Sequence, residues 1–259
     1  ACVISIRLIR RESTRLMGVL SRYDDRFFTW FTGFSPPEFR LCFKTVHQPR
    51  DWESMEFQPG EMYHIYNRGN NRQQIFQERK NYLYFIGKIR NHLLKHSDIL
   101  AWCLMPNHFH IMIRVHDDYD PKFMRASKHT SAPVVQPLNR SIAIMLSSYT
   151  KGFNRMYQRT GSLFQARTKS KVVHLENRRK RDYPLNCFIY IHQNPIRANL
   201  VNKLEDWEFS SYRDFATLRD GSLCNLTLAR ELLNLPTDLQ EFRIFSEQTI
   251  PEHYRGILH

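Results

Sequence analysis

Cysteine is scarce in this sequence, and its placement excludes two classes of small stabilised protein. The five cysteines of the 259-residue chain are Cys2, Cys42, Cys103, Cys187 and Cys224. Structural zinc sites and disulfide frameworks need cysteines paired at characteristic spacings, and none of these residues is so paired. We therefore interpret them as reduced thiols that mostly fill a core.

Long apolar runs are also missing. No stretch approaches the roughly 18 consecutive apolar residues of a membrane-spanning helix, and the N-terminus lacks the pattern of a secretory signal peptide. The apolar fraction of 42% is nevertheless ordinary for a globular protein. We expect a folded protein of the cytoplasm without a membrane partner.

Acidic residues are too few to balance the basic ones. The chain contains 38 Lys and Arg against 25 Asp and Glu, a formal charge of +13. Residues 1–54 contribute 9 − 6 = +3, which leaves +13 − 3 = +10 for residues 55–259. Such a surplus predicts a polyanionic partner, nucleic acid first, although a basic surface also serves anionic membranes or solubility.

Two histidines occupy alternate positions in a segment that predicts a buried strand. The segment Met105–Val115 reads MPNHFHIMIRV, and its apolar run from Ile111 is typical of a strand. Because residues i and i+2 of a strand point to the same face, His108 and His110 are expected side by side, with Phe109 turned into a core. Neutral imidazoles so placed form half of a site for a divalent metal. The alternative is a pair of histidines that only pack or form hydrogen bonds.

A second segment combines a tyrosine with an amide four residues later. Pro184 suits the first turn of a helix, and a helix from there places Tyr190 and Asn194 on one face as an i, i+4 pair. A tyrosine hydroxyl at such a position is a candidate nucleophile. The alternatives are that Tyr190 packs in the core and that Asn194, which precedes Pro195, caps a new helical turn near Arg197.

Five motifs appear in an order that resembles a known family. Together they resemble the HUH single-tyrosine transposases, most closely the REP-associated tyrosine transposases, over roughly residues 55–215. His64 in the first motif is a second-tier candidate ligand, since a strand histidine is more often structural. The motifs are Tyr63–Gly69 (YHIYNRG), Leu104–His110 (LMPNHFH), Gly161–Gln165 (GSLFQ), Tyr190–Ala198 (YIHQNPIRA) and Trp207–Tyr212 (WEFSSY).

The resemblance implies a specific chemistry. Tyr190 would attack the phosphorus of a DNA strand and form a 5′-phosphotyrosyl intermediate with a free 3′-OH, so that a later strand is rejoined without a nucleotide cofactor. His108 and His110 would hold a divalent metal, Mg²⁺ or Mn²⁺, with Asn194 as a third ligand. The implied partner is single-stranded or hairpin-forming DNA at the nucleoid of a bacterial cytosol, and the implied assembly is a monomer or a homodimer.

Two other functions stay open at this point. One is a catalytically silent regulator that binds structured nucleic acid through the basic surface. The other is a metal phosphodiesterase in which the two histidines act without a covalent step and Tyr190 is structural. A silent binder is disfavoured because it has no chemical need for His108, His110 and Tyr190 together.

The periodicity of the chain predicts an α+β fold. A strand, an amphipathic helix and a strand pair open the pattern, as in one half of a ferredoxin-like fold. We therefore expect a ferredoxin-like antiparallel sheet with helices on its faces, the histidine pair on a central strand and Tyr190 on a helix. The expected elements are strands over 62–67, 99–105, 109–115 and 167–171, and helices over 78–96, over 139–158 and from 184.

Basic and amide side chains near these elements are the candidates for DNA contact. The turn Arg68–Arg72 carries cations and amides that suit a phosphate, although a solvated turn has the same composition. Cations at the end of the 139–158 helix also favour the helix dipole, and Gln165 can either read a base edge or cap a turn. The full set is Arg68, Asn70, Arg72, Lys151, Arg155, Arg159, Gln165, Arg167, Lys169, Lys171, Arg178, Arg179 and Arg197.

The sequence divides into three parts. Residues 1–54 differ in character from the rest, and we expect a non-native or flexible leader with Met55 as the natural start; an accessory module is the alternative. Residues 55–215 form the transposase-like domain, in which Trp207–Tyr212 packs under the tyrosine helix. Residues 216–259 form a tail that predicts one last helix from Leu228, Leu232, Leu233 and Leu235.

Overall fold

The computed structural model describes residues 56–122, 136–173, 183–252 and 254. All of them lie in one compact unit, which spans residues 47–259. The expected leader and the candidate DNA contacts Arg178 and Arg179 lie outside the described residues. The division into three parts therefore stays a prediction.

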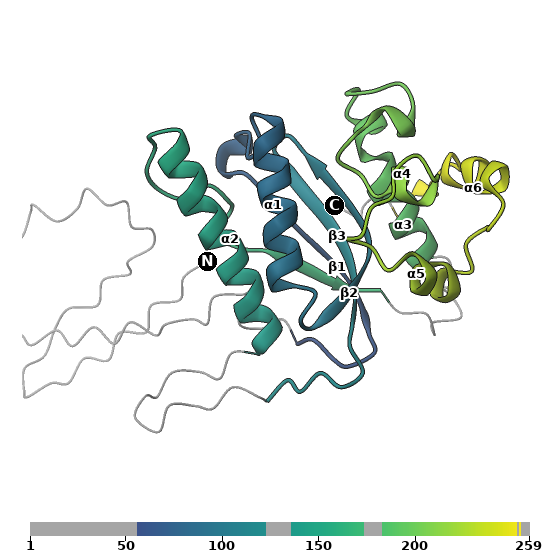
Figure 1. The fold of residues 1–259 in the computed structure, drawn as a ribbon, viewed down its shortest axis with the longest axis horizontal. Coiled ribbons are helices and arrows are strands. Elements are labelled where there is room, and N and C mark those ends of the chain that lie inside the picture. Colours follow the sequence, from purple (N-terminus) through teal and green to yellow (C-terminus); the bar gives the residue numbers. More distant parts are fainter. Residues whose placement is uncertain (1–55, 123–135, 174–182, 253, 255–259) are drawn as a thin grey trace, which may run out of the picture. The chain divides into compact units, whose positions relative to one another are not determined.

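A four-stranded sheet forms the centre of this unit (Figure 1). Its order is β2-β3-β1-β4, and every pair of neighbours is antiparallel. With its two helices the chain follows a β-α-β-β-α-β path, which is the ferredoxin-like topology. The predicted fold class is thus confirmed, with the histidine strand β3 at the centre. The elements are β1 (Met62–Arg68), α1 (Arg79–His92), β2 (Ser97–Met105), β3 (His108–Val115), α2 (Pro137–Met156) and β4 (Lys169–Val172).

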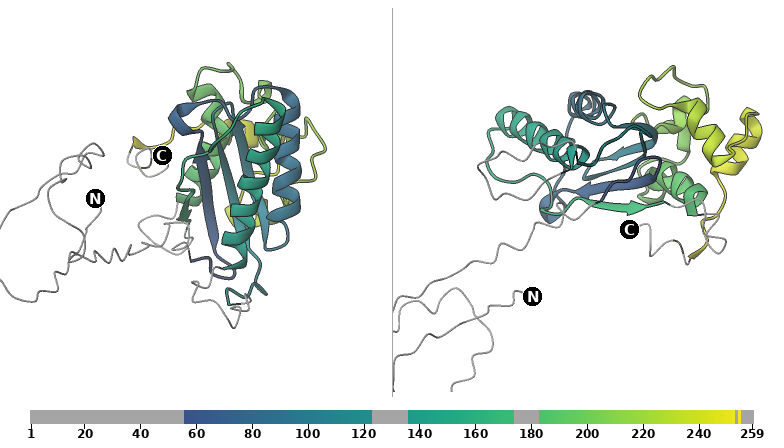
Figure 2. Two further views of the ribbon diagram at one scale, coloured as in Figure 1. Left: turned by 90° about the vertical axis from the view of Figure 1, so that its left-hand side faces the viewer. Right: turned by 90° about the horizontal axis from the view of Figure 1, so that it is seen from below.

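Alternation along the strands creates two separate cores. In β3, Phe109 and Ile111 pack with the residues of α1 and α2, whereas Met112 packs with those of α3. Figures 1 and 2 show α1 and α2 on one side of the sheet and the C-terminal helices on the other. The second layer consists of α3 (Tyr183–Arg197), α4 (Tyr212–Phe215), α5 (Leu226–Leu233) and α6 (Leu239–Ser246).

Several predicted elements differ in their bounds or number from those observed. Helix α1 ends at His92 and not at 96, because the chain then turns and the backbone N–H groups of His96 and Ser97 both donate to the Leu93 carbonyl. The tail forms two helices and not one, since Asn234 takes a left-handed conformation (φ 48°) that ends α5. Strand β4 starts at Lys169, so Arg167 precedes it.

The Trp207–Tyr212 segment lies against β2 and also contacts α3, the helix under which the sequence predicts that it packs. The backbone N–H of Leu104 donates to the Phe209 carbonyl, and that of Ser211 donates to the Trp102 carbonyl, both at 2.9 Å. The Ser211 Oγ also lies 2.8 Å from Nε2 of His192, a buried residue of α3. The segment therefore covers the outer edge of β2 and anchors the helix that carries Tyr190. In the described part of the chain, no helix is long and apolar enough to cross a membrane.

A partly buried ion pair fastens this segment to the residues that follow it. The carboxylate of Asp214 accepts from Nε and Nη2 of Arg219 at 2.6 and 2.9 Å. Arg219 also donates to the carbonyl oxygens of Glu208 and Ser210. Because the Asp214 side chain is only 1% exposed, its charge depends on this guanidinium.

Removing that carboxylate is expected to destabilise the protein. In Asp214→Asn the Arg219 charge loses its counter-ion, and we expect a loss of about 2 kcal/mol in the free energy of unfolding. The matched control is Glu208→Gln, because Glu208 contacts Nε and Nη2 of Arg79 in the same way but on the surface. Denaturant titration should show a much smaller loss for the control. Equal losses in the free energy of unfolding for the two variants would show that the burial of Asp214 does not affect its contribution to stability.

Candidate active site

The candidate site lies on the sheet face that α3 covers, where the strand register sets side chains in rows. Tyr66 of β1 lies opposite His110 of β3, and Arg68 lies opposite His108. On the other side of β1, Lys169 of β4 lies opposite Tyr66. Directly opposed residues have Cβ atoms about 5 Å apart and share a face. A lysine, a tyrosine and a histidine therefore form one row across three strands.

The two histidines predicted from the sequence lie side by side at the end of β3. Their ring centroids are 5.1 Å apart. Nδ1 of His108 lies 2.6 Å from Oδ1 of Asn107, and Nδ1 of His110 lies 2.9 Å from Nε2 of His64. Each imidazole is therefore held through Nδ1 by a neighbouring side chain, which the sequence pattern did not indicate.

His64 is a buried, neutral neighbour of this pair. Its ring is fully buried on β1 and stacks on Tyr66 with 4.8 Å between centroids. Burial, and then the charge of Lys171, lower the pKa of His64 from 6.5 to about 3. The sequence indicates His64 only as a second-tier candidate ligand. In the structure it contacts His110 directly.

Helix α3 places Tyr190 directly over the histidines. Its ring centroid lies 5.3 Å from that of His110 at an interplanar angle of 87°, and its side chain is almost completely buried. Burial raises the pKa of the Tyr190 phenol above its ordinary value of 10, and the cations Arg197 and Arg68 oppose that rise. The guanidinium carbon of Arg197 lies 5.7 Å from the centre of the ring. The phenol is thus protonated at neutral pH and needs further positive charge to ionise.

Asn194 lies one turn after Tyr190 on the same helix. Its Nδ2 donates to the Tyr190 carbonyl at 2.7 Å, and α3 runs through Pro195 to Arg197 without a break. The new turn considered in the sequence is therefore not formed. Because Nδ2 is a donor, Oδ1 is the Asn194 atom that could bind a metal.

The chemistry of these donors fits a divalent metal whose coordination would be completed by oxygen atoms of the substrate or of water. Among the described residues, no group of three or more His, Cys, Asp or Glu side chains is arranged to hold an ion. Nδ1 of His108 and of His110 is engaged, so a metal would bind through Nε2 of each. Two imidazoles, one carboxamide oxygen and substrate or water oxygens form a donor set that both Mn²⁺ and Mg²⁺ accept.

Tyr66 is a residue of this site that the sequence analysis missed. Its ring stacks on His64 and on His110, and the amino groups of Lys169 and Lys171 lie 5.6 and 5.5 Å from its centre. The buried hydroxyl has no hydrogen-bond partner in the part of the chain that the structure describes. Strand alternation could have found it, because Tyr66 is two residues from His64 and must share its face.

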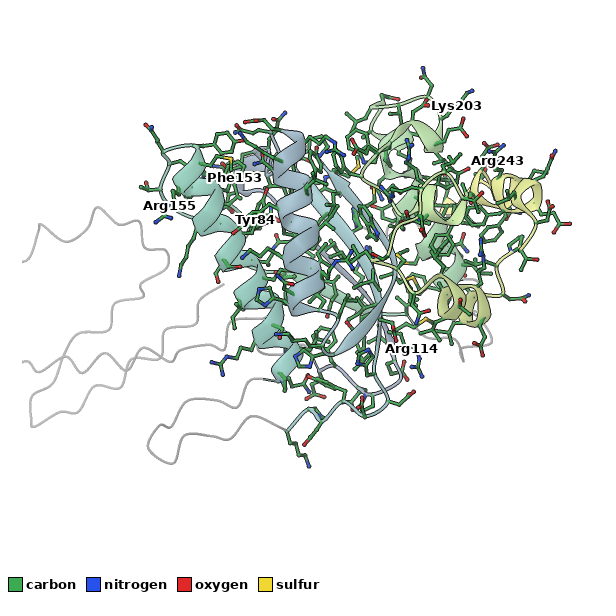
Figure 3. All side chains as sticks on the ribbon, viewed as in Figure 1. Tyr84, Arg114, Phe153, Arg155, Lys203 and Arg243 are labelled. Carbon is green, nitrogen blue, oxygen red and sulfur yellow. The ribbon has the colours of Figure 1, made fainter. Side chains whose placement is uncertain are left out.

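Ten of the candidate DNA contacts fall into three groups. Arg68, Lys169, Lys171 and Arg197 surround Tyr190 and Tyr66. Asn70, Arg72, Arg159 and Gln165 lie in loops joined by the bridge between Gly69 and Phe164, next to Asn107. Lys151 and Arg155 are exposed on α2, in the layer opposite α3, as the label of Arg155 in Figure 3 shows.

The candidate DNA contacts are therefore only partly brought together. The structure places the first group on the sheet face that carries His108 and Tyr190, and the second in loops at the His108 end of the sheet, where Arg159 lies over Phe153 of α2. It does not bring Lys151 and Arg155 to them, because α2 packs on the other face. Arg167 is exposed just before β4.

The chain thus contains a ferredoxin-like domain with one candidate site. In that site a buried tyrosine lies over two histidines, and cations surround them. Residues 58–168 match the family model described as "Transposase IS200 like". The resemblance to single-tyrosine transposases that the motifs indicate is confirmed for this segment. The match includes His108 and His110 and ends before α3, so it does not extend to Tyr190.

One solved structure, described as "Structure of the REP associates tyrosine transposase bound to a REP hairpin", is also similar to the chain. It is 17% identical, with a TM-score of 0.42, over 66% of this chain and 87% of the other. No curated protein sequence gives a significant match.

Proposed function

We propose that the protein is a tyrosine transposase that nicks and rejoins single-stranded, hairpin-forming DNA. The observation that carries this proposal is the 5.3 Å between the rings of Tyr190 and His110, which belong to α3 and β3 of one chain. Two residues whose numbers differ by 190 − 110 = 80 meet there, one a nucleophile and the other a member of a metal-ligand pair. The IS200-like match over residues 58–168 supports an enzyme that acts on DNA.

The proposed reaction is a transesterification at one phosphodiester. The Tyr190 oxygen forms a bond to phosphorus, the bond from phosphorus to the 3′ oxygen breaks, and the phenolic proton passes to the solvent as the 3′ oxygen gains one. A 5′-phosphotyrosine and a free 3′-OH result. A second 3′-OH can reverse the step, which rejoins DNA without another energy source.

The chain's own groups supply most of the positioning. Arg197 and Arg68 lower the cost of ionising Tyr190, because their charges favour the phenolate. Lys169 and Lys171 lie where they can neutralise the phosphate that approaches over Tyr66. Asn194 ties its amide to the Tyr190 carbonyl and so fixes this turn of the helix.

His108 and His110 are the residues that would hold a divalent metal, with the Oδ1 of Asn194 as a further donor. When bound, Mn²⁺ or Mg²⁺ supplies Lewis-acid polarisation of the scissile phosphate. Because one chain already places Tyr190 over His110, we propose that a monomer contains the whole site.

The direct test is incubation with end-labelled hairpin DNA. The protein with Mn²⁺ or Mg²⁺ should form an adduct with single-stranded hairpin DNA that survives SDS, and none with a blunt duplex of the same sequence. Cleavage without an adduct would support a phosphodiesterase with two histidines instead. Binding without cleavage over many hairpins would support a silent binder.

The lysines of β4 are expected to contribute binding energy that depends on salt. In the Lys169→Ala/Lys171→Ala variant, the slope of log K against log[salt] should fall by about 0.7 for each lost phosphate contact on a single strand. Lys88→Ala is the matched control, because Lys88 lies on α1 over Tyr84, in the layer opposite α3. An unchanged slope in the double variant would place the DNA elsewhere on the surface.

A further inference from the structure

We propose that Asn107 and His64 fix the two histidines of the site in the tautomer that turns Nε2 toward a metal. The inference rests on the proposed function, because it concerns the ligands of that same site. It assigns a positioning role to one residue from the hairpin turn before β3 and to one from β1. Neither residue would touch the metal.

The tautomer of His108 follows from the orientation of the Asn107 amide. Nδ2 of Asn107 donates to the carbonyl oxygen of Arg72 at 3.4 Å, and a carbonyl oxygen can only accept. The atom of Asn107 that faces His108 is therefore Oδ1, which is also only an acceptor. His108 must then donate through Nδ1–H at 2.6 Å. In a neutral imidazole this leaves the lone pair on Nε2.

The contact between His110 and His64 allows two tautomers of His110, of which one can bind a metal. Nδ1 of His110 and Nε2 of His64 are 2.9 Å apart, so one of them carries the hydrogen. If His64 donates, the proton of His110 lies on Nε2, where a metal would have to bind. If His110 donates, its Nε2 has the lone pair and His64 carries its proton on Nδ1. Only the second arrangement allows His110 to bind a metal through Nε2. His108 and His110 then have the same tautomer, with the proton on Nδ1.

The fold holds His64 rigidly enough for this role. Its ring is fully buried, stacks on Tyr66 at 4.8 Å, and sits on β1, the neighbouring strand of β3. The rings of His64 and His110 both stack on Tyr66, which fixes the plane of each ring. Hydrogen bonds to the second nitrogen of a ligating histidine orient the ring and raise its basicity.

The first experiment reads the tautomers directly in the protein without metal or DNA. In ¹⁵N-histidine-labelled protein, NMR should show His108, His110 and His64 each protonated on Nδ1 and not on Nε2. Signals are assigned with single His→Gln variants. A His110 protonated on Nε2 would overturn the proposal. Because this readout needs neither cleavage nor metal, it stays informative if the protein is not a nuclease.

The second experiment measures Mn²⁺ affinity by EPR titration. His64→Phe keeps the aromatic stack and loses the acceptor, and Asn107→Leu loses the acceptor for His108. Each should weaken Mn²⁺ binding by roughly 10- to 100-fold. His64→Gln retains an acceptor oxygen and should keep most of the affinity. His96→Phe is the control, because His96 lies near Ser141 of α2, in the other layer.

Each outcome of the titration has a definite meaning. Unchanged affinity in His64→Phe and Asn107→Leu would overturn the positioning role. Equal losses in His64→Phe and His64→Gln, with unchanged melting temperatures, would also overturn it, since packing and not the hydrogen bond would then matter. If the unaltered protein does not bind Mn²⁺ while NMR shows the expected tautomers, the metal-dependent function fails and the tautomer assignment stands.

Discussion

Tyr190→Phe is expected to abolish the covalent adduct with DNA and to reduce strand cleavage by on the order of 10⁴-fold or more. The substitution removes only the hydroxyl, and the ring keeps its place over His110. Loss of an essential nucleophile cannot be compensated by positioning alone. Gel analysis of the SDS-resistant band and single-turnover cleavage rates measure the two effects.

Tyr183→Phe is the matched control for this prediction. Tyr183 is also a buried tyrosine of α3, but its ring packs near Tyr254, 5.9 Å away between centroids. The control should keep the adduct and the rate. An adduct that survives in Tyr190→Phe would contradict the assignment and direct attention to Tyr66, the other phenol beside His110.

His110→Ala is expected to have the second largest effect. Loss of one imidazole ligand should remove the metal's contribution at the phosphate, which we take as about 4 kcal/mol, or roughly 10³-fold in rate. Adduct formation should no longer respond to added Mn²⁺. The measurement is the cleavage rate as a function of Mn²⁺ concentration, with thermal unfolding to confirm that the variant is folded.

The control for His110→Ala is His92→Ala. His92 ends α1, in the layer opposite α3, and is only partly buried. Its loss should leave the rate and its dependence on metal unchanged. A His110→Ala variant with a normal rate at high Mn²⁺ would show that the histidine pair is not the metal site.

The second core explains why the tyrosine helix can hold its position. Residues of α5 and α6 pack in the same cluster as the apolar face of α3, and Gln193 of α3 donates to the carbonyl oxygens of Ser246 and Gln248. On the side of α3 that faces the sheet, Nε2 of His192 lies within hydrogen-bond distance of Oγ of Ser211. The C-terminal residues therefore form part of the support for Tyr190 and do not pack separately from it.

The sequence predicted the elements whose pattern is local. Alternation placed His108 and His110 on one face of β3, and helical spacing placed Tyr190 and Asn194 on α3. Contacts between strands were not accessible in this way. The bond between His64 and His110 depends on a register between segments 46 residues apart, which no local period encodes.

Other departures have equally physical causes. The cations of α2 were grouped with the other candidate DNA contacts because periodicity shows where a helix is apolar and not which face of the sheet it covers. The ends of α1 and α5 depend on turn conformations, such as the positive φ of Asn234, that residue types only favour. The role of Asn194 was open because the residue before a proline is disfavoured in a helix and asparagine is a good cap, whereas α3 in fact continues through Pro195.

The central claim is that Tyr190 is the residue that becomes linked to DNA. The most direct measurement is mass spectrometry of the protease-digested adduct formed with hairpin DNA and Mn²⁺. We predict a peptide from α3 that carries nucleotides through a 5′-phosphate on Tyr190. Nucleotides on any other residue, or complete cleavage without a modified peptide, would contradict the account.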